Sequence, residues 1–230
     1  MKTTKKSKLN FLKKFSHIWV LIYVPIYMYC FTRLEETTSP SDMTLIHLPI
    51  DDVIPFCEYF IVPYLFWFVY IFAVGVFQFF YGKPGFYRYC VFLFSGMTLS
   101  LIIYALWPNG IHLRPDLASI PRDNIFMDAV AKLYEIDTPT NVCPSIHVLN
   151  SIGATVSLLK NEDFSKKLSR RIASIVTCVL ICLSTVFLKQ HSCFDVVCAL
   201  VMSVGLYVLA YNPKLLKIEA TVKEHEKAYT

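Results

Sequence analysis

The stretch from Phe56 to Tyr81, FCEYFIVPYLFWFVYIFAVGVFQFFY, decides the fold. It carries no charge after Glu58, and it is longer than the ~20 residues that a helix needs to cross the hydrocarbon of a bilayer. Charged residues make up 17% of the chain, against about 25% in soluble domains. The remaining apolar residues also gather in long runs, so the sequence predicts an all-α integral membrane protein.

Six apolar runs are predicted to span the membrane. They extend from about Phe15 to Phe31, Phe56 to Tyr81, Tyr87 to Trp107, Ser145 to Leu159, Ile172 to Leu188 and His191 to Tyr211. The fourth is short and polar for a span. The basic start resembles the beginning of a signal peptide, but no small-residue cleavage site follows, so we interpret it as leading into a first helix. The predicted organisation is a basic segment at 1–14, a six-helix domain at 15–211 and a tail at 212–230.

The distribution of charge predicts the orientation. With the amino terminus in the cytoplasm, 17 of the 22 Lys and Arg residues fall inside and 12 of the 17 acids fall outside. An excess of Lys and Arg on the cytoplasmic side is the usual rule, so both termini are expected in the cytoplasm and the protein in the plasma membrane. The net charge of +5 is then an orientation signal, and no nucleic-acid partner is expected.

Two external segments are long, residues 33–55 and 108–144. Within the second, apolar residues at helical spacing predict an amphipathic helix that begins at a cap formed by Asp123. We expect this helix to lie on the membrane surface over the functional groups described next. The alternative is a loop segment that merely covers helix ends.

Three ionisable side chains are predicted to meet at the external face. His147 begins the fourth span, and His191 and Asp195 lie four apart at the start of the sixth, where they would share one helical face. Ionisable groups beside hydrocarbon are costly and usually functional. A carboxylate that holds one imidazole nitrogen leaves the other free to attack or to transfer protons. Packing of interfacial histidines for structural reasons alone is the competing interpretation.

Around these groups the sequence predicts a phosphate-binding site. Pro144 suits a first helical turn, and the free amides of Ser145, Ile146 and His147 would form an anion site there. Arg114 can add a two-pronged contact to phosphate oxygens. Arg114 and Lys189 could instead be an ordinary loop cation and a lysine reaching toward water.

The eight cysteines show no metal-binding spacing. Most fall inside apolar runs, where cysteine packs as a small hydrophobe. Cys143 and Cys193 lie near the two histidines, so a disulfide or a metal pair there is an alternative to simple packing. We predict no metal and no cofactor.

At these residues the chain resembles the phosphatidic acid phosphatase type 2 superfamily. That family has the motifs Lys-x6-Arg-Pro, Pro-Ser-Gly-His and Ser-Arg-x5-His-x3-Asp. Here Arg114-Pro115 matches the end of the first motif, Pro144-Ser145-Ile146-His147 matches the second except at Gly, and Ser184 with His191 and Asp195 matches the third. The six-helix plan is also similar, so the resemblance implies the fold shared with vanadium chloroperoxidase-like proteins.

Three departures from the motifs are informative. Trp107 and Thr185 stand where the family has Lys and Arg, and Lys189 and Arg122 are the candidates to replace those cations. Ile146 stands where the family has Gly, which is similar to the inositolphosphorylceramide and sphingomyelin synthase branch.

The resemblance implies roles for the matched residues. His191 would be the nucleophile that forms a phosphohistidine, Asp195 would orient it, and His147 would protonate the leaving alcohol. Arg114, Ser145, Ile146 and Lys189 would bind the phosphoryl oxygens.

The expected function is hydrolysis of a membrane lipid phosphate at the external face. Transfer of a phospho-headgroup to another lipid is the alternative, and an inactive lipid-binding or transport protein is a third hypothesis. The lipid and the oligomeric state are left open.

Overall fold

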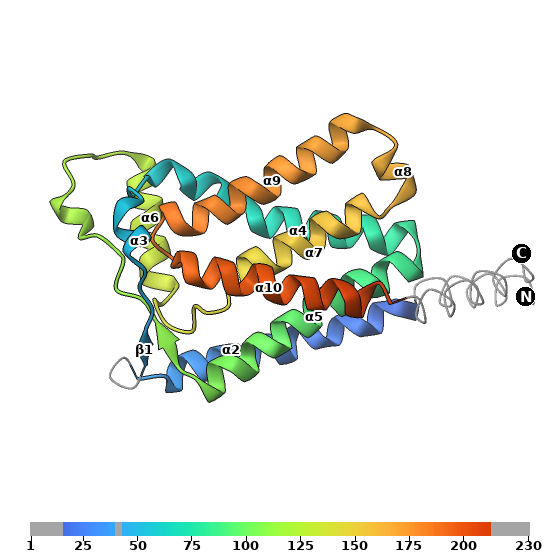
Figure 1. Ribbon diagram of the computed structural model, residues 1–230, viewed down its shortest axis with the longest axis horizontal. Helices are drawn as coiled ribbons and strands as arrows, with labels where there is room; N and C mark the ends of the chain where they lie inside the picture. The colour runs from blue at the N-terminus through green and yellow to red at the C-terminus, as the bar shows by residue number, and fades with distance from the viewer. Residues whose placement is uncertain (1–15, 40–42, 213–230) are drawn as a thin grey trace, which may run out of the picture.

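The computed structural model describes residues 16–39 and 43–212, and this part of the chain is mostly helical (Figure 1). The basic segment predicted at 1–14 lies outside these residues, and so does the tail predicted at 212–230 except for its first residue. The elements are η1 Ser16–Ile22, α2 Tyr23–Thr37, β1 Thr44–Leu45, α3 Pro49–Val53, η2 Glu58–Phe60, α4 Ile61–Tyr81, α5 Lys83–Leu106, β2 Asn109–Gly110, η3 Leu117–Ser119, α6 Ile125–Ile136, α7 Ile146–Leu159, α8 Glu162–Ser165, α9 Leu168–Phe187 and α10 Cys193–Ala210.

Within the described residues, five helical segments are long and apolar enough to cross a membrane. They are Ser16–Thr37, Glu58–Tyr81, Lys83–Leu106, Leu168–Phe187 and Cys193–Ala210. Their outward faces carry large exposed apolar side chains such as Phe72, Val201 and Phe68, which suits contact with lipid tails. The fourth expected span corresponds to α7, an apolar helix of 14 residues.

Several predicted boundaries were wrong by a few residues. α2 continues past Phe31 to Thr37, α5 begins at Lys83 and α9 at Leu168, while α10 begins at Cys193 rather than at His191. The first three differ because helices continue into the polar surface layer, where charged side chains can reach water. The start of α10 differs because the Ser192 hydroxyl accepts from the Phe194 N–H at 3.1 Å and caps the helix.

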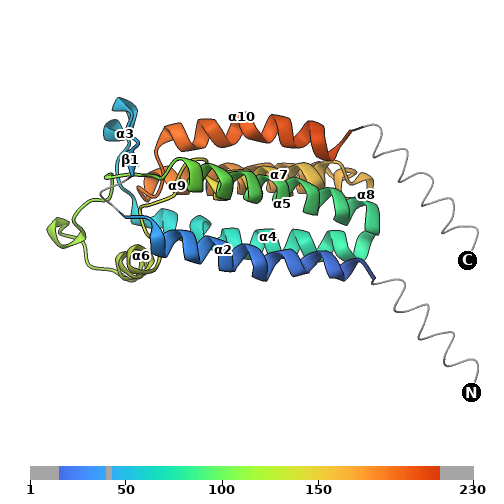
Figure 2. The ribbon, with the colours of Figure 1, turned by 90° about the horizontal axis from the view of Figure 1, so that it is seen from below.

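α7 lies at the centre of the bundle and contacts α4, α5, α9 and α10. Figure 2 shows α10 on one side of it and α4 on the other. Close packing depends on Gly153, since a Cβ there would collide with the Phe92 ring and come within 2.7 Å of Leu93 Cδ1. Polar side chains also join the helices: the Tyr70 hydroxyl lies 2.7 Å from Thr155 Oγ1 and 2.8 Å from Ser174 Oγ, which links α4 to α7 and α9.

The connections cover one end of the bundle, opposite α8 (Figure 1). β1 pairs in parallel with β2, with Thr44 opposite Asn109 and Leu45 opposite Gly110. The short helix α3 and the amphipathic helix α6 lie at this same end (Figure 2). These segments hold the loops that carry the candidate functional groups.

α6 exists as predicted, but its predicted cap was wrong. Asn124, not Asp123, caps it, because the Asn124 side-chain oxygen accepts from the N–H groups of Phe126 and Met127. The buried side of α6 places Val130 against Tyr64 of α4, so the helix is held on the end of the bundle.

Candidate functional site

Two histidines from distant segments face each other at the covered end of the bundle. The ring centroids of His147 and His191 are 6.0 Å apart, with an angle of 61° between the ring planes. His147 is the second residue of α7, and His191 lies in the turn between α9 and α10. The structure therefore brings together the two imidazoles that the sequence analysis predicted to meet.

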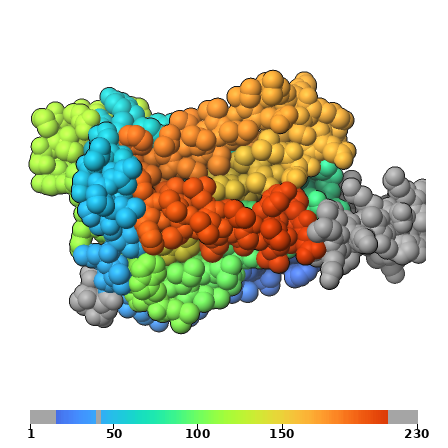
Figure 3. Space-filling model, in the orientation of Figure 1, coloured from blue at the N-terminus to red at the C-terminus, as the bar shows by residue number. Residues whose placement is uncertain are grey.

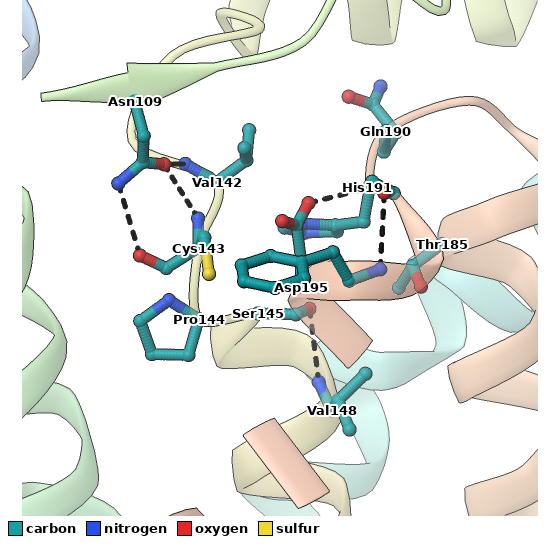
Figure 4. A network of polar contacts seen from close by, with 12 residues as sticks. Asn109, Val142, Cys143, Pro144, Ser145, Val148, Thr185, Gln190, His191 and Asp195 are labelled. Atoms are coloured by element: carbon teal, nitrogen blue, oxygen red, sulfur yellow. Dashed lines mark hydrogen bonds and ion pairs between the residues drawn. The ribbon is translucent and has the colours of Figure 1, made fainter. Parts of the chain in front are cut away.

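Asp195 holds His191, although not through the predicted helical face. His191 precedes α10, and its Nδ1 lies 3.4 Å from Asp195 Oδ2. The same oxygen accepts from the Ser192 N–H at 2.9 Å. The turn is fixed from the other side because the N–H groups of Gln190 and His191 both donate to the Thr185 carbonyl. Figure 4 shows His191 and Asp195 together on the α10 side of the site.

His147 is packed between aromatic rings of α4. Its ring centroid lies 4.5 Å from that of Tyr64 and 4.4 Å from that of Trp67. Its Nε2 atom is buried and makes no hydrogen bond in the described structure, and the same holds for Asp195 Oδ1. Buried polar atoms are nearly always bonded, so His147 Nε2 and Asp195 Oδ1 stand out as unsatisfied polar atoms of this site.

The start of α7 is set by Asn109, which the sequence analysis did not single out. The Asn109 side-chain oxygen accepts from the N–H groups of Val142 and Cys143, and its nitrogen donates to the Cys143 carbonyl (Figure 4). The same nitrogen also donates to the Trp107 carbonyl. The Tyr104 hydroxyl also donates to the Pro144 carbonyl at 2.6 Å. These contacts tie the segment before His147 to the end of α5.

Ser145 is engaged with neighbouring backbone rather than free. Its hydroxyl accepts from the Val148 N–H at 3.5 Å, and its own N–H donates to the Asp195 carbonyl at 3.4 Å. The expected anion site is therefore reduced to the amides of Ile146 and His147, which at the first turn of a helix have no carbonyl partner within it.

Arg114 binds protein acceptors. Its guanidinium donates to the carbonyls of Tyr134 and Asp137 and, at 2.6 Å, to the Gln190 side-chain oxygen. It also lies over the Tyr134 ring, 4.5 Å from the centroid. Contact with a phosphate stays a prediction, and the observed bonds tie α6 to the residue before His191. Nε of Arg114 is buried without a partner in the described residues.

Lys189 bonds the α3 segment. Its ammonium group donates to the carbonyls of Asp51 and Ile54. Burial lowers the pKa of Lys189, while the charge of Asp51 acts in the opposite direction. Phosphate binding by Lys189 also stays a prediction. Arg122, the other proposed replacement cation, pairs with the buried carboxylate of Glu58 at 3.0 Å.

Asp51 is a second residue that the sequence analysis missed. Its carboxylate accepts from the Ser192 hydroxyl at 2.6 Å and from the Cys193 N–H at 2.8 Å. Burial alone would raise the pKa of Asp51, but these bonds and one from the Leu48 N–H outweigh it and hold the pKa below its ordinary value. In the space-filling view, the segment containing α3 lies against the start of α10 (Figure 3).

Trp107 and Thr185, which stand where the family motifs have Lys and Arg, make local hydrogen bonds. Trp107 donates from its ring nitrogen to the Thr44 hydroxyl at 3.0 Å, and Thr185 bonds the Cys182 carbonyl through its hydroxyl.

Cys143 and Cys193 are both free thiols, so the disulfide alternative is not formed. Among residues 16–39 and 43–212, no cluster of three His, Cys, Asp or Glu side chains could hold a metal ion.

Comparison of the chain with protein-family models, with curated proteins and with solved structures finds no match.

Proposed function

We propose that the protein is a membrane enzyme that hydrolyses a lipid phosphate at the covered end of the bundle. The observation that carries the proposal is the pair of imidazoles from distant segments, one of them held at Nδ1 by a buried carboxylate. A nucleophile oriented by a third group, with a proton donor across from it, is the arrangement that covalent catalysis requires.

The proposed reaction has two steps. His191, held through Nδ1, attacks phosphorus with Nε2, and the bond from phosphorus to the lipid oxygen breaks as His147 gives that oxygen a proton. His147 then removes a proton from water, whose oxygen attacks phosphorus, and the bond to His191 breaks to release phosphate. Asp195 stabilises the positive charge on the His191 ring, and general acid–base help is typically worth ~10²–10⁴-fold in rate.

Binding of the phosphoryl group rests mainly on backbone donors in this proposal. The amides of Ile146 and His147 point from the start of α7, and a helix amino terminus favours anions. Arg114 contributes through its free Nε and through Gln190, which it fixes beside His191. Lys189 sets the shape of the turn from the far side.

The membrane arrangement follows from the same proposal. α7 would cross the membrane as the fourth of six spans, and the covered end would face the exterior of the cell, with the bundle in the plasma membrane and both termini in the cytoplasm. This plan is the one expected for the phosphatidic acid phosphatase type 2 superfamily and its vanadium chloroperoxidase-like relatives.

Phosphotransfer to a second lipid is the runner-up, and one observation favours it. His191 is only 7% exposed, and His147 is enclosed by Tyr64 and Trp67. A site with so little access for water would slow hydrolysis of a phosphohistidine, so that the hydroxyl of another lipid could accept the phosphoryl group. Ile146 at the position of the motif glycine points the same way.

The test uses purified full-length protein with phosphatidic acid or a polyprenyl phosphate, with and without an acceptor lipid. Phosphate release supports hydrolysis, and a labelled acceptor supports transfer. We expect His191→Ala to abolish both, whereas His112→Ala, an exposed histidine in the β2–α6 connection, leaves turnover unchanged.

A wild-type protein that accumulates an acid-labile phosphoprotein, lost in His191→Ala, would support the nucleophile. Full turnover in His191→Ala would refute the assignment. Lipid binding without any turnover by the wild type would favour the inactive or transport alternative.

A further inference from the structure

Tyr64 of α4 connects the His147 ring to the end of α6. The two rings stack, with 4.5 Å between their centroids and 30° between their planes. Tyr64 is 1% exposed, and a buried hydroxyl needs a hydrogen-bond partner. The Tyr64 hydroxyl donates to Asp137 Oδ2 at 2.9 Å, across 73 positions of the chain. The ring of Tyr64 is therefore held from both sides, and it fixes one face of His147.

The carboxylate of Asp137 is not explained by the helix that it follows. Asp137 is the first residue after α6, and its N–H donates to the Leu133 carbonyl at 2.9 Å. A negative charge is unfavourable at the carboxyl end of a helix, because the helix dipole is negative there. The contact with Tyr64 gives this side chain a role outside α6.

The same residue is also connected to the turn that carries the second imidazole. Arg114 Nη2 donates to the Asp137 carbonyl at 2.6 Å and to the Gln190 side-chain oxygen at 2.6 Å. Gln190 directly precedes His191 in the chain. The end of α6 thus contacts the supports of both histidines, one through a carboxylate and the other through a main-chain carbonyl.

We propose that Tyr64 and Asp137 are positioning residues that set the distance and the angle between the two imidazoles. Neither touches the substrate; Asp137 acts on His147 through the Tyr64 ring. For turnover the inference rests on the proposed function, in which His191 and His147 must reach one phosphoryl group at the same time. Holding reacting groups in one geometry is a large part of what an enzyme supplies.

The first experiment measures kcat and KM of the full-length protein with a lipid phosphate. Tyr64→Phe keeps the ring and removes only the hydroxyl that Asp137 holds. It should lower kcat by about 10–100-fold, because a displacement of ~1 Å at a reacting group can cost ~10²-fold. KM should change little, since the lost contact is not one with the substrate.

Tyr89→Phe is the matched control. Tyr89 of α5 is buried, and its hydroxyl donates to the Ile71 carbonyl of α4 at 2.8 Å. Its ring lies beside Gly75, about three helical turns along α4 from Tyr64. The control therefore removes the same atom from the same helix pair at a distance from the histidines. It should keep wild-type kcat, and thermal unfolding midpoints show whether the two variants are equally folded.

Asp137 is tested together with Tyr64 in a double-mutant cycle. Asp137→Ala removes the acceptor and should lower kcat as much as Tyr64→Phe does. The double variant should lose no more than either single variant, because all three break the same hydrogen bond. Asp137→Asn keeps an oxygen that accepts from the hydroxyl and should retain most of the turnover. Asp128→Ala, at an exposed position of α6, should behave as wild type.

A second experiment reads the histidine rings directly and does not depend on turnover. Protein with 15N-labelled histidine side chains is studied by NMR, and the His147 signal is assigned as the one that is lost in His147→Gln. Tyr64→Phe and Asp137→Ala should shift this signal, because the stacked ring moves. Tyr89→Phe should leave it in place.

An unshifted His147 signal in Tyr64→Phe would overturn the proposal, and so would a wild-type kcat in that variant. Additive losses in the cycle would also overturn it, since they would mean that Tyr64 and Asp137 act separately. Absence of turnover in the wild type would instead refute the proposed function, and the His147 signal would still decide whether the two residues fix the ring.

Discussion

The Asp51 carboxylate accepts a hydrogen bond from the Ser192 hydroxyl at 2.6 Å, although 141 positions separate the two residues in the chain. Ser192 directly follows His191 and caps α10. The α3 segment is therefore part of the support of the candidate nucleophile, and its removal should loosen the turn that carries the imidazole.

Asp51→Asn should destabilise the protein by about 1.5–3 kcal/mol, the range for a hydrogen bond to a charged group. The amide keeps only one acceptor oxygen and cannot satisfy the Ser192 hydroxyl and the N–H groups of Leu48 and Cys193 together. Thermal unfolding in detergent measures the loss. Asp52→Asn is the matched control, because Asp52 is exposed and its carboxylate bonds the exposed His47 ring at 2.9 Å.

The Asp51 effect should depend on pH. Its folded pKa is depressed below the ordinary value of 3.8 by the bonds from Cys193, Ser192 and Leu48, which outweigh burial. A carboxylate whose pKa is lower in the folded state than in the unfolded state stabilises the folded protein. This stabilisation is complete above the unfolded pKa and is lost as the pH falls through the folded pKa. The difference in unfolding midpoint between wild type and Asp51→Asn should therefore be constant near neutral pH and shrink below pH 3.8. A difference that grows with acidity would contradict this account.

Asp195→Asn should reduce phosphate release by at least about 10²-fold if Asp195 orients the nucleophile and stabilises its charge. The variant keeps the size of the side chain and one acceptor for the Ser192 N–H. The readout is kcat against KM with a lipid phosphate, since an orienting role lowers kcat more than it raises KM. Asp116→Asn, at an exposed loop position, should behave as wild type.

Asn124→Ala should destabilise α6 by about 0.5–2 kcal/mol, the usual effect of losing a helix cap. It removes the acceptor for two N–H groups and also a contact of 3.3 Å to Glu58. Hydrogen exchange of the α6 amides reports the loss directly. Asp123→Ala should leave exchange unchanged, and the reverse result would restore Asp123 as the cap.

Gly153→Ala should cost about 1–3 kcal/mol, because the added methyl group has no space between α7 and α5. Gly205→Ala makes the same chemical change in α10, where no atom lies within 4 Å of the new Cβ, and should leave stability unchanged or slightly raised. The thermal unfolding midpoint of each variant is measured. The difference between them separates the destabilisation caused by crowding from the effect of helix propensity.

The sequence predicted the long helices because their apolar length is a property of the chain itself. Their ends were less predictable: Lys83 starts α5, although a charge usually marks the limit of a span. The end of a helix depends on its cap and on the reach of side chains to water, so composition alone misplaced it.

The candidate site was predictable where spacing determines geometry. His191 and Asp195 are close, as expected, even though a cap rather than a helical face brings them together. Asp51 and Asn109 could not be found in this way. Each acts on a segment far away in the sequence, so its role appears only when the tertiary contacts are known. Most hydrogen-bond partners of Arg114 and Lys189 are main-chain carbonyl groups, which leave no pattern in a sequence.

The central position of α7 has a consequence for its length. The hydrophobic thickness of a bilayer dictates the length of a helix that touches lipid, because unmatched backbone and polar groups would meet hydrocarbon. α7 is surrounded by α4, α5, α9 and α10, so its surroundings are protein and not hydrocarbon. The length of α7 is therefore not bound by the thickness of the bilayer, and the helix can be short, carry hydroxyl and amide side chains, and hold a histidine in its first turn.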